Sequence, residues 1–478
     1  MVPLMLLVTA APQRYTDSQL AMEVTNLPGI PANTTFKQFA GYVPVSSMGS
    51  VFFWFVESQG SPTEDPVALW TNGGPGCSGL TGFLTEHGPF RPLSDGTLKA
   101  NPFAWNKLAN MVYVEQPIGV GFSPVSGTMN YNDSQAASDN LEFVAGFFKL
   151  FPQFARQNFY ITSESYGGHY MPTLAEAIVA SGGRVPNFKG FLVGNPLTYL
   201  TNRNYGEFAT YYGHQLLPKP LWDAYLAASC KDAPGLDPGP ACANITNLME
   251  GLVKDLDPYG LDFPKCADSP LAVGMHERWT LRSVIRPRAN GRKGPPPNAA
   301  GRNGAPAPYP YFPRDYEPCA SDWAADYLSR KDVQAAIHAK PGGVTWTGNW
   351  SACSNNVSAT YSQTDVAAPM MPVYQRLVAK GGLKMTIFSG DDDAVCATRG
   401  TQQWIWDLGL PVKTPWTPWM MDDGPGCPRG PACRQVGGYI TRYDGLNLVT
   451  VHGAGHLVPA TRPAAGLVVL RNYLLGVF

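Results

Sequence analysis

The sequence has little charge and no excess of either sign. Asp, Glu, Lys and Arg make up 15% of its 478 residues, and the formal net charge is −1; an average globular protein has about 25% charged residues. Nucleic acids and anionic membrane surfaces are attracted by a strongly unbalanced charge, which this composition does not provide. We therefore expect neither nucleic acid nor a bilayer surface as a partner.

Three further features are missing. Past the N-terminus, no apolar run reaches the roughly 18 residues that a membrane-spanning helix needs, so no membrane span is expected. The nine cysteines do not occur as paired C-x-x-C ligands, which argues against a zinc site of that kind. The glycine-rich stretch Asn72–Gly79 is not followed by G-K-S/T, which excludes a P-loop. We expect no metal and no cofactor.

The chain does contain the signals of a secreted protein. Residues 1–11 resemble the apolar core and small-residue end of a signal peptide, without its positively charged start. Nine cysteines fit four disulfides and one free thiol. We predict passage through the secretory pathway to a vacuole, a lysosome or the outside, as a monomer or homodimer. The N-x-S/T glycosylation sequons are at Asn33, Asn132, Asn244, Asn349 and Asn356.

Strand-like and helix-like segments alternate along much of the chain. This rhythm predicts an α/β fold, with a mostly parallel central sheet and helices on both faces. The expected strands are 49–56, 67–71, 111–115, 159–162, 188–193, 383–388 and 446–451. The expected helices are 133–151, 170–178, one through Trp404 and Trp406, and 463–475.

The alternation breaks between about residues 198 and 330, a segment that is aromatic, cysteine-containing and rich in loops. We predict that it is an insertion that caps the sheet, between a first core part, 12–197, and a second, 331–478. Inside it, residues 282–314 are basic and rich in Gly, Pro and Asn, a composition that cannot bury a core. We expect an exposed linker that proteases can cut.

The segment around Ser165 has the order strand, sharp turn, helix. A β-favouring run, Phe159–Thr162, leads into Glu164–Gly168, and a helical pattern follows from Tyr170. A nucleophile elbow has this context, since it holds a serine hydroxyl above a sheet at the tip of a strained turn. Ser163 replaces the first glycine of G-x-S-x-G, so the motif alone does not exclude an ordinary turn.

A serine nucleophile needs a base, and the base needs an acid that fixes its tautomer. Candidates follow three predicted strands in the order Ser165, Asp391–Asp393, His456, and the C-terminal ends of parallel strands meet at one edge of a sheet. This order is that of the α/β-hydrolase fold. His456, in the loop beyond the last strand, is preferred as base to His169, on the helix after Ser165, and to His452.

Five segments together carry a family resemblance over nearly the whole chain. They are Leu69–Ser78, Glu115–Ser123, Glu164–Tyr170, Ser389–Asp391 with Asp393 and Cys396, and Gly453–Pro459. With these segments in this order, the chain resembles the serine carboxypeptidase family, which includes yeast carboxypeptidase Y and lysosomal cathepsin A. The resemblance implies an α/β-hydrolase fold with an inserted cap region.

The resemblance also implies roles for single residues. Ser165 would be the nucleophile, His456 the base, and Asp393 the orienting acid. Asp393 is preferred within its acidic run because Cys396, the family's cysteine, follows it by three residues. The backbone N–H groups of Gly74 and Tyr166 would form the oxyanion hole. The groups that would bind the substrate's C-terminal carboxylate are Asn72, the Gly73 N–H, Glu86 and Glu164.

The two glutamates in this set predict a pH dependence. Carboxyl groups that lie close together raise a pKa, so that in acid solution they share a proton and can donate a hydrogen bond to an anionic substrate terminus. At higher pH both ionise and repel it, so we expect peptidase activity to be strongest below neutrality. Without the resemblance, Glu164 would be interpreted as an exposed turn residue and Glu86 as a helix-surface residue.

Disulfide pairing is implied by the resemblance as well. It gives Cys77–Cys353, Cys230–Cys242 and Cys266–Cys319, and leaves Cys396 as a free thiol beside the active site. A fourth pair, Cys427–Cys433, is inferred only from the proximity of the two residues in the sequence.

The leading interpretation is a serine-type carboxypeptidase that releases single residues from the C-termini of peptides and proteins through an acyl-enzyme. The alternative is an acyltransferase or esterase on the same scaffold. Relatives of that kind often carry Asp at the position of Glu164, so Glu164 together with Glu86 favours the peptidase. A catalytically silent binding or protective protein is a third interpretation, against which an intact triad argues.

Overall fold

The computed structural model describes residues 15–45, 49–127, 129–266, 316–340, 348–421 and 434–478. Three predictions fall outside the described residues: the signal-like residues 1–11, the basic linker 282–314 and the pair Cys427–Cys433. Among the helices of the described part, none is long and apolar enough to cross a membrane.

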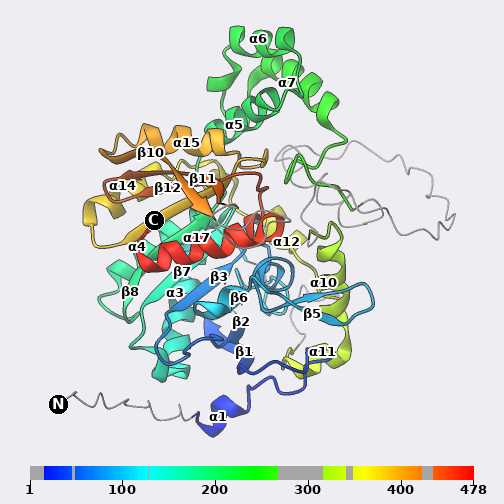
Figure 1. Ribbon diagram of the computed structural model, residues 1–478, viewed down its shortest axis with the longest axis vertical. Coiled ribbons are helices and arrows are strands. Elements are labelled where there is room, and N and C mark those ends of the chain that lie inside the picture. The colour runs from blue at the N-terminus through cyan, green and yellow to red at the C-terminus, as the bar shows by residue number, and fades with distance from the viewer. Residues whose placement is uncertain (1–14, 46–48, 128, 267–315, 341–347, 422–433) are drawn as a thin grey trace, which may run out of the picture.

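A ten-stranded sheet forms the centre of the molecule (Figure 1). In their order across the sheet, the strands are β1 (Gln38–Val45), β2 (Gly49–Val56), β6 (Asn110–Glu115), β3 (Val67–Thr71), β7 (Phe159–Glu164), β8 (Phe188–Gly194), β9 (Lys384–Gly390), β12 (Asn447–Val451), β11 (Gln435–Tyr443) and β10 (Val412–Met421). The six strands from β6 to β12 run parallel, and two more strands at each edge pair antiparallel. A separate hairpin joins β4 (Phe90–Pro92) and β5 (Leu98–Ala100). The predicted α/β fold with a mostly parallel sheet is confirmed.

Helices cover both faces of this sheet. One face packs against α3 (Asp133–Leu150), α4 (Gly167–Ala180), α14 (Met371–Lys380) and α15 (Thr398–Asp407). The other face packs against the π-helical turn η1 (Gly82–Glu86), α10 (Ala320–Ser329), α11 (Lys331–Ala336), α16 (Val458–Thr461) and α17 (Pro463–Leu475). Short helical segments lie between these elements: α1 (Asp17–Leu20), α2 (Gly79–Thr81), η2 (Trp105–Lys107), η3 (Pro152–Phe154), α12 (Asn355–Thr360) and α13 (Gln363–Ala367).

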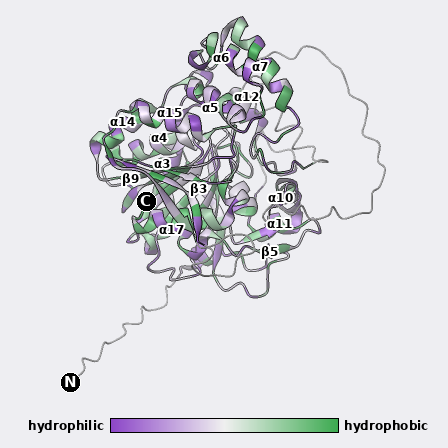
Figure 2. Ribbon diagram, turned by 45° about the horizontal axis from the view of Figure 1, so that its top comes forward, coloured by the Kyte–Doolittle hydropathy of each residue, from purple (hydrophilic) through white to green (hydrophobic). Residues whose placement is uncertain are grey.

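Strand β2 shows why the central strands are apolar throughout. Val51, Phe53 and Phe55 belong to the core on the α3 side, while Phe52 and Trp54 belong to the core on the other side. Successive side chains of a strand point to opposite faces, so a strand covered on both faces reads as an unbroken apolar run. The covering helices instead carry both hydrophobic and hydrophilic residues (Figure 2), because only one side of each meets the sheet.

Residues 200–253 form a helical layer at the end of the molecule farthest from α1 (Figure 1). It consists of α5 (Leu200–Gly213), α6 (Lys219–Ala227), η4 (Cys230–Asp232) and α7 (Gly239–Val253), packed around a small core of its own. The prediction that this part is loop-rich was wrong, because most of residues 200–253 are helical. Pro220 and Pro240 stand in the first turns of α6 and α7, where proline does not interrupt a helix. The limits of the insertion, 198 and 330, stay predictions.

Candidate active site

The turn between β7 and α4 carries Ser165. Its φ is +59°, in the left-handed region that costs a non-glycine residue about 1–3 kcal/mol. Hydrogen bonds fix the turn: the Ser165 N–H donates to the Gly194 carbonyl (2.9 Å), and its carbonyl accepts from the Leu197 N–H (2.8 Å). Gly168 is required, because a Cβ there would lie 2.2 Å from the Leu197 oxygen. These are the features of a nucleophile elbow, with Ser163 tolerated as the last but one residue of β7.

His456 and Asp393 form a buried pair in loops that follow β12 and β9. The Nδ1 of His456 donates to Asp393 Oδ2 at 2.8 Å, and the two side chains are only 2% and 0% exposed. Three more donors hold the carboxylate: Asn195 Nδ2 (2.8 Å), the Val395 N–H (2.7 Å) and the Cys396 N–H (3.1 Å). With Nδ1 engaged in this way, the ring nitrogen left for proton transfer is Nε2.

Ser165 and His456 line the same cavity, of about 180 Å³. The wall of this cavity also contains Asn72, Gly73 and Glu164 from the sheet edge, and Tyr259 from the segment after α7. The ring of Tyr259 lies edge-on to that of His456, with centroids 5.1 Å apart. The structure therefore brings the predicted nucleophile, base and acid to one edge of the sheet, which is the arrangement that acyl transfer to a serine requires.

The Gly73–Gly74 segment lies directly against the elbow. A Cβ on Gly73 would be 2.4 Å from the Tyr166 nitrogen and 2.9 Å from the Ser165 Cβ, so only glycine allows this approach. Gly74 has φ +122°, a conformation that side-chain-bearing residues rarely adopt. The Gly73–Gly74 segment therefore packs closely against the backbone of Ser165 and Tyr166. The oxyanion hole formed by the Gly74 and Tyr166 N–H groups stays a prediction.

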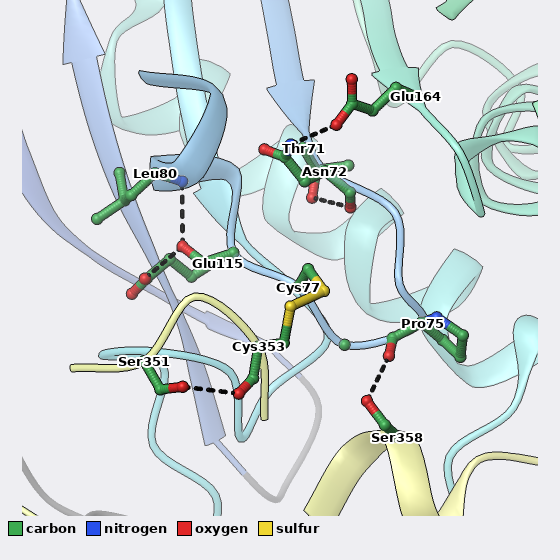
Figure 3. Close-up of a disulfide and its surroundings, with 12 residues drawn as sticks. Thr71, Asn72, Pro75, Cys77, Leu80, Glu115, Glu164, Ser351, Cys353 and Ser358 are labelled. Atoms are coloured by element: carbon green, nitrogen blue, oxygen red, sulfur yellow. Dashed lines mark hydrogen bonds between the residues drawn. A yellow bond between two sulfur atoms is a disulfide. The ribbon is translucent and has the colours of Figure 1, made fainter. Parts of the chain in front are cut away.

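A disulfide anchors this loop from outside (Figure 3). Cys77 is bonded to Cys353, and the Cys77 N–H donates to the Gly73 carbonyl at 3.1 Å. Two residues before Cys77, the Pro75 carbonyl accepts a hydrogen bond from the Ser358 hydroxyl at 2.9 Å (Figure 3). Covalent and hydrogen-bonded links from residues 353–358 therefore fix the position of the glycine-rich segment.

Two buried carboxyl groups meet at Asn72. Its Nδ2 donates to Glu164 Oε1 at 2.7 Å (Figure 3) and to Glu86 Oε1 at 3.1 Å. The orientation of the amide follows from its other end, where Oδ1 accepts from Trp70 Nε1 and from the Gly82 N–H, both at 2.9 Å. Glu86 and Glu164 are only 1% and 3% exposed.

Burial sets the protonation of this pair. Burial raises the pKa of Glu86 to about 7, and burial together with the nearby charge of Glu86 raises the pKa of Glu164 well above its ordinary value. The interpretation of Glu164 as an exposed turn residue and of Glu86 as a helix-surface residue was wrong. Glu164 ends the buried strand β7, and Glu86 ends the π-helical turn η1, all of whose residues are buried.

Sequence reasoning missed Asn195, which orients the acid. Its Nδ2 donates to Asp393 Oδ2, and its Oδ1 accepts from the Gly390 N–H at 3.0 Å. The available signal was its position, since it directly follows β8 at the same sheet edge as the other site residues.

His169 has the structural place expected for it. Its Nδ1 donates to Asp133 Oδ2 at 2.9 Å, and its ring stacks on Tyr166 with centroids 4.4 Å apart. Asp133 also accepts from the Tyr166 hydroxyl at 3.0 Å, so this network holds the residue after Ser165 in place.

Of the four expected disulfides, three lie in the described residues and are present: Cys77–Cys353, Cys230–Cys242 and Cys266–Cys319. Cys396 is the free cysteine of the described part, and it is buried. Four sequon asparagines are exposed, namely Asn33, Asn244, Asn349 and Asn356. Asn132 is half-buried and caps α3 by accepting from the Gln135 N–H at 2.8 Å. Glycosylation at these sites stays a prediction.

Comparisons with known proteins place the chain in a family. A family model described as "Serine carboxypeptidase" matches residues 28–476. "Serine carboxypeptidase-like 27" of Arabidopsis thaliana is 35% identical, over 97% of this chain and 94% of its own. "Serine carboxypeptidase-like 26" of Oryza sativa subsp. japonica is 34% identical, over 96% of this chain and 91% of its own.

Among solved structures, the fold is similar to that of Kex1(Δ)p, a prohormone-processing carboxypeptidase from Saccharomyces cerevisiae. The TM-score is 0.73 at 20% identity, and the match covers 96% of each chain. The fold is therefore the α/β-hydrolase fold of serine carboxypeptidases. Since the family model and the curated relatives each match nearly the full length, the chain belongs to the serine carboxypeptidase family.

Proposed function

We propose that this protein is a serine-type carboxypeptidase that removes single residues from the C-termini of peptides and proteins and works best in acid solution. The observation that carries the proposal is the cluster of Asn72, Glu86 and Glu164, buried beside Ser165. A hydrolase of neutral esters needs a nucleophile, a base and an oxyanion hole, but it has no use for two buried acids at the leaving-group side.

The reaction begins with acylation of Ser165. Its hydroxyl attacks the last peptide carbonyl while His456 Nε2 takes the proton, and the Asp393 carboxylate stabilises the imidazolium through Nδ1. The negative oxygen of the tetrahedral intermediate accepts from the Gly74 and Tyr166 N–H groups. Such donors contribute about 3–4 kcal/mol each to the lowering of a barrier. His456 then protonates the leaving amine, and water attacks the acyl-enzyme by the same steps in reverse.

The acidic cluster selects for a free C-terminus. The terminal carboxylate of the peptide accepts from Asn72 Nδ2, the Gly73 N–H and a protonated carboxyl of the glutamate pair. Because burial raises both pKa values, the pair carries protons up to about pH 7, the value for Glu86, and can donate there. Above that pH the negative charge of the pair repels the substrate's carboxylate, so the peptidase activity is highest in acid solution.

One substrate comparison tests the proposal against its alternative. An N-blocked dipeptide with a free C-terminus is assayed beside its C-terminal amide and its ester, all at about pH 5. Faster release from the free acid than from the amide supports a carboxypeptidase. Cleavage of the ester alone supports an acyltransferase or esterase, and no turnover of any of the three points to a silent binding protein.

We also propose that the protein is made in the secretory pathway. Three disulfides in the described residues and five sequons support an oxidising compartment. Protein from its native source should lose apparent mass on treatment with an N-glycosidase, and an unchanged mass would contradict the proposal.

A further inference from the structure

The loop after β9 holds three consecutive aspartates, Asp391–Asp393, and each of them faces a histidine. The first and third accept hydrogen bonds at 2.8 Å from His452 and His456. The middle one, Asp392, has its Oδ1 at 4.0 Å from Nδ1 of His214, which is too long for a hydrogen bond. Asp392 and His214 therefore form no hydrogen bond with each other, unlike the other two Asp–His pairs.

Asp392 is buried, with only 2% of its surface exposed. Its Oδ2 accepts from the Asp262 N–H at 3.1 Å, whereas Oδ1 has no hydrogen-bond partner among the described residues. Asp262, Asp391 and Asp393 add negative charge around it. A buried carboxylate oxygen with no donor is costly, about 1–3 kcal/mol or more for a charged group, so this position is suited to a positive ligand.

A third side chain completes the group. One nitrogen of His214 and one carboxylate oxygen each of Asp262 and Asp392 all lie within 4.8 Å of one another. Around Zn²⁺, ligand atoms at about 2.0–2.2 Å from the ion stand roughly 3.5 Å apart, so binding requires the three to approach by about 1 Å. His214 is the C-cap residue of α5, Asp262 lies in the segment after α7, and both are exposed. They can shift, and they leave an entry path for an ion.

We propose that His214, Asp262 and Asp392 form a binding site for a divalent transition-metal ion, with zinc as the best match. One imidazole and two carboxylates suit zinc better than calcium or magnesium, which take oxygen ligands only. Water would fill the fourth position. His214 follows α5 and Asp262 follows α7, while Asp392 adjoins Asp393. The ion would therefore link the helical layer of residues 200–253 to the loop that carries Asp393.

This site lies outside the reacting groups. The carboxylate oxygens of Asp393 accept from His456, Asn195 and two backbone N–H groups, whereas Asp392 contacts Asp262 and His214. The ion therefore acts as a structural link and takes no part in the chemistry. The expectation of no metal rested on cysteine spacing, which carries no information about a His/Asp/Asp group.

The test uses the purified full chain after dialysis against EDTA. Isothermal titration with ZnCl₂ should give one equivalent bound, with an increase in Tm on addition of the metal. Asp262→Asn and His214→Gln should each weaken binding by about tenfold or more. His452→Gln is the matched control. It removes the histidine that pairs with Asp391, and neither residue belongs to the proposed site. This variant should therefore bind zinc as the unchanged protein does. Bound Co²⁺ should show visible absorption bands of a low-coordinate site.

The proposal is overturned by either of two results. One is the absence of binding of ZnCl₂ and CoCl₂ at millimolar concentration. The other is binding that both variants retain, or that His452→Gln also loses, since the ion would then sit elsewhere. The Tm of each variant without metal, compared with that of the unchanged protein, separates loss of a ligand from loss of the fold. None of these readouts depends on peptidase activity.

Discussion

Replacing both buried glutamates by glutamine isolates the role of their protons. In the double variant Glu86→Gln/Glu164→Gln, each side chain keeps the Oε1 that accepts from Asn72 and gains an N–H that can donate to a substrate carboxylate. What is lost is the ability to ionise. If the pair binds the C-terminus of the peptide through a shared proton, the variant should still bind it but no longer respond to pH.

The size of the effect follows from the pKa of Glu86, which burial raises to about 7. The protonated fraction then falls from about nine-tenths at pH 6 to about one-tenth at pH 8. Two like charges about 4 Å apart near a protein surface repel by about 4 kcal/mol, so the ionised form binds an anionic terminus far more weakly. The preference for a free C-terminus should therefore fall about tenfold between pH 6 and pH 8.

The assay is the ratio of kcat/KM for a blocked dipeptide acid to kcat/KM for its amide, measured from pH 5 to pH 8.5. The ratio cancels any pH effect that is common to both substrates. The unchanged protein should show the tenfold fall, and the double variant should vary by less than about twofold. A flat ratio in the unchanged protein, or the same fall in both proteins, would refute the reasoning.

The same variant has a consequence for stability. The folded pKa of Glu86 lies above its ordinary value of 4.5, so folding favours the protonated form. The resulting stability is complete below about pH 4.5 and is lost as the pH rises towards about 7. At about 1.4 kcal/mol per pH unit, Glu86 alone accounts for a loss of about 3 kcal/mol over that window. Denaturant titrations at pH 5 and pH 8 should show a smaller loss in the double variant.

Three further variants test other parts of the site. Asp393→Asn should lower kcat by about 10³–10⁴-fold, because the amide favours the wrong imidazole tautomer, with little change in the binding of a competitive inhibitor. Gly73→Ala should lower kcat by at least about 10²-fold, since its Cβ would lie 2.4 Å from the Tyr166 nitrogen; an active variant would exclude the proposed oxyanion hole. Removing the Cys77–Cys353 disulfide by Cys→Ser at both positions should lower the free energy of unfolding by about 2–5 kcal/mol in urea titrations, because the bridge closes a segment of 276 residues.

The central strands could be predicted from the sequence, and the edge strands could not. The predicted strand 67–71 and helix 463–475 match β3 and α17 in both bounds. Buried on both faces, a central strand shows its apolar run whatever its neighbours are. Of the missed strands, β1 and β10 are the two edge strands and β11 pairs with β10; β10 contains Pro415 and Pro418. Prolines are tolerated in an edge strand, so only the pairing with β11 reveals it.

The site residues also fall into those that could be placed from the sequence and those that could not. Ser165, Asp393 and His456 could be placed because each follows a strand whose end lies at a known edge of the sheet. Glu86 had no such signal. Its burial depends on η1 packing beneath Trp70, where a Cβ on Gly82 would lie 2.2 Å from the indole nitrogen. Trp70 belongs to β3 and Gly82 to η1, and most of the chain between them is irregular. A contact of this kind leaves no periodic pattern in the sequence.

The backbone turn at Ser165 explains how two successive residues can line one cavity. Successive residues of a strand point to opposite faces, so Glu164 and Ser165 in a continued strand could not address one cavity. The left-handed φ of +59° at Ser165 breaks that alternation, and both side chains line the same cavity. The hydrogen bonds to Gly194 and Leu197 maintain the strain. In the carboxypeptidase that we propose, this strained turn would set the distance between the nucleophile and the carboxylate-binding site, and with it the removal of one residue at a time.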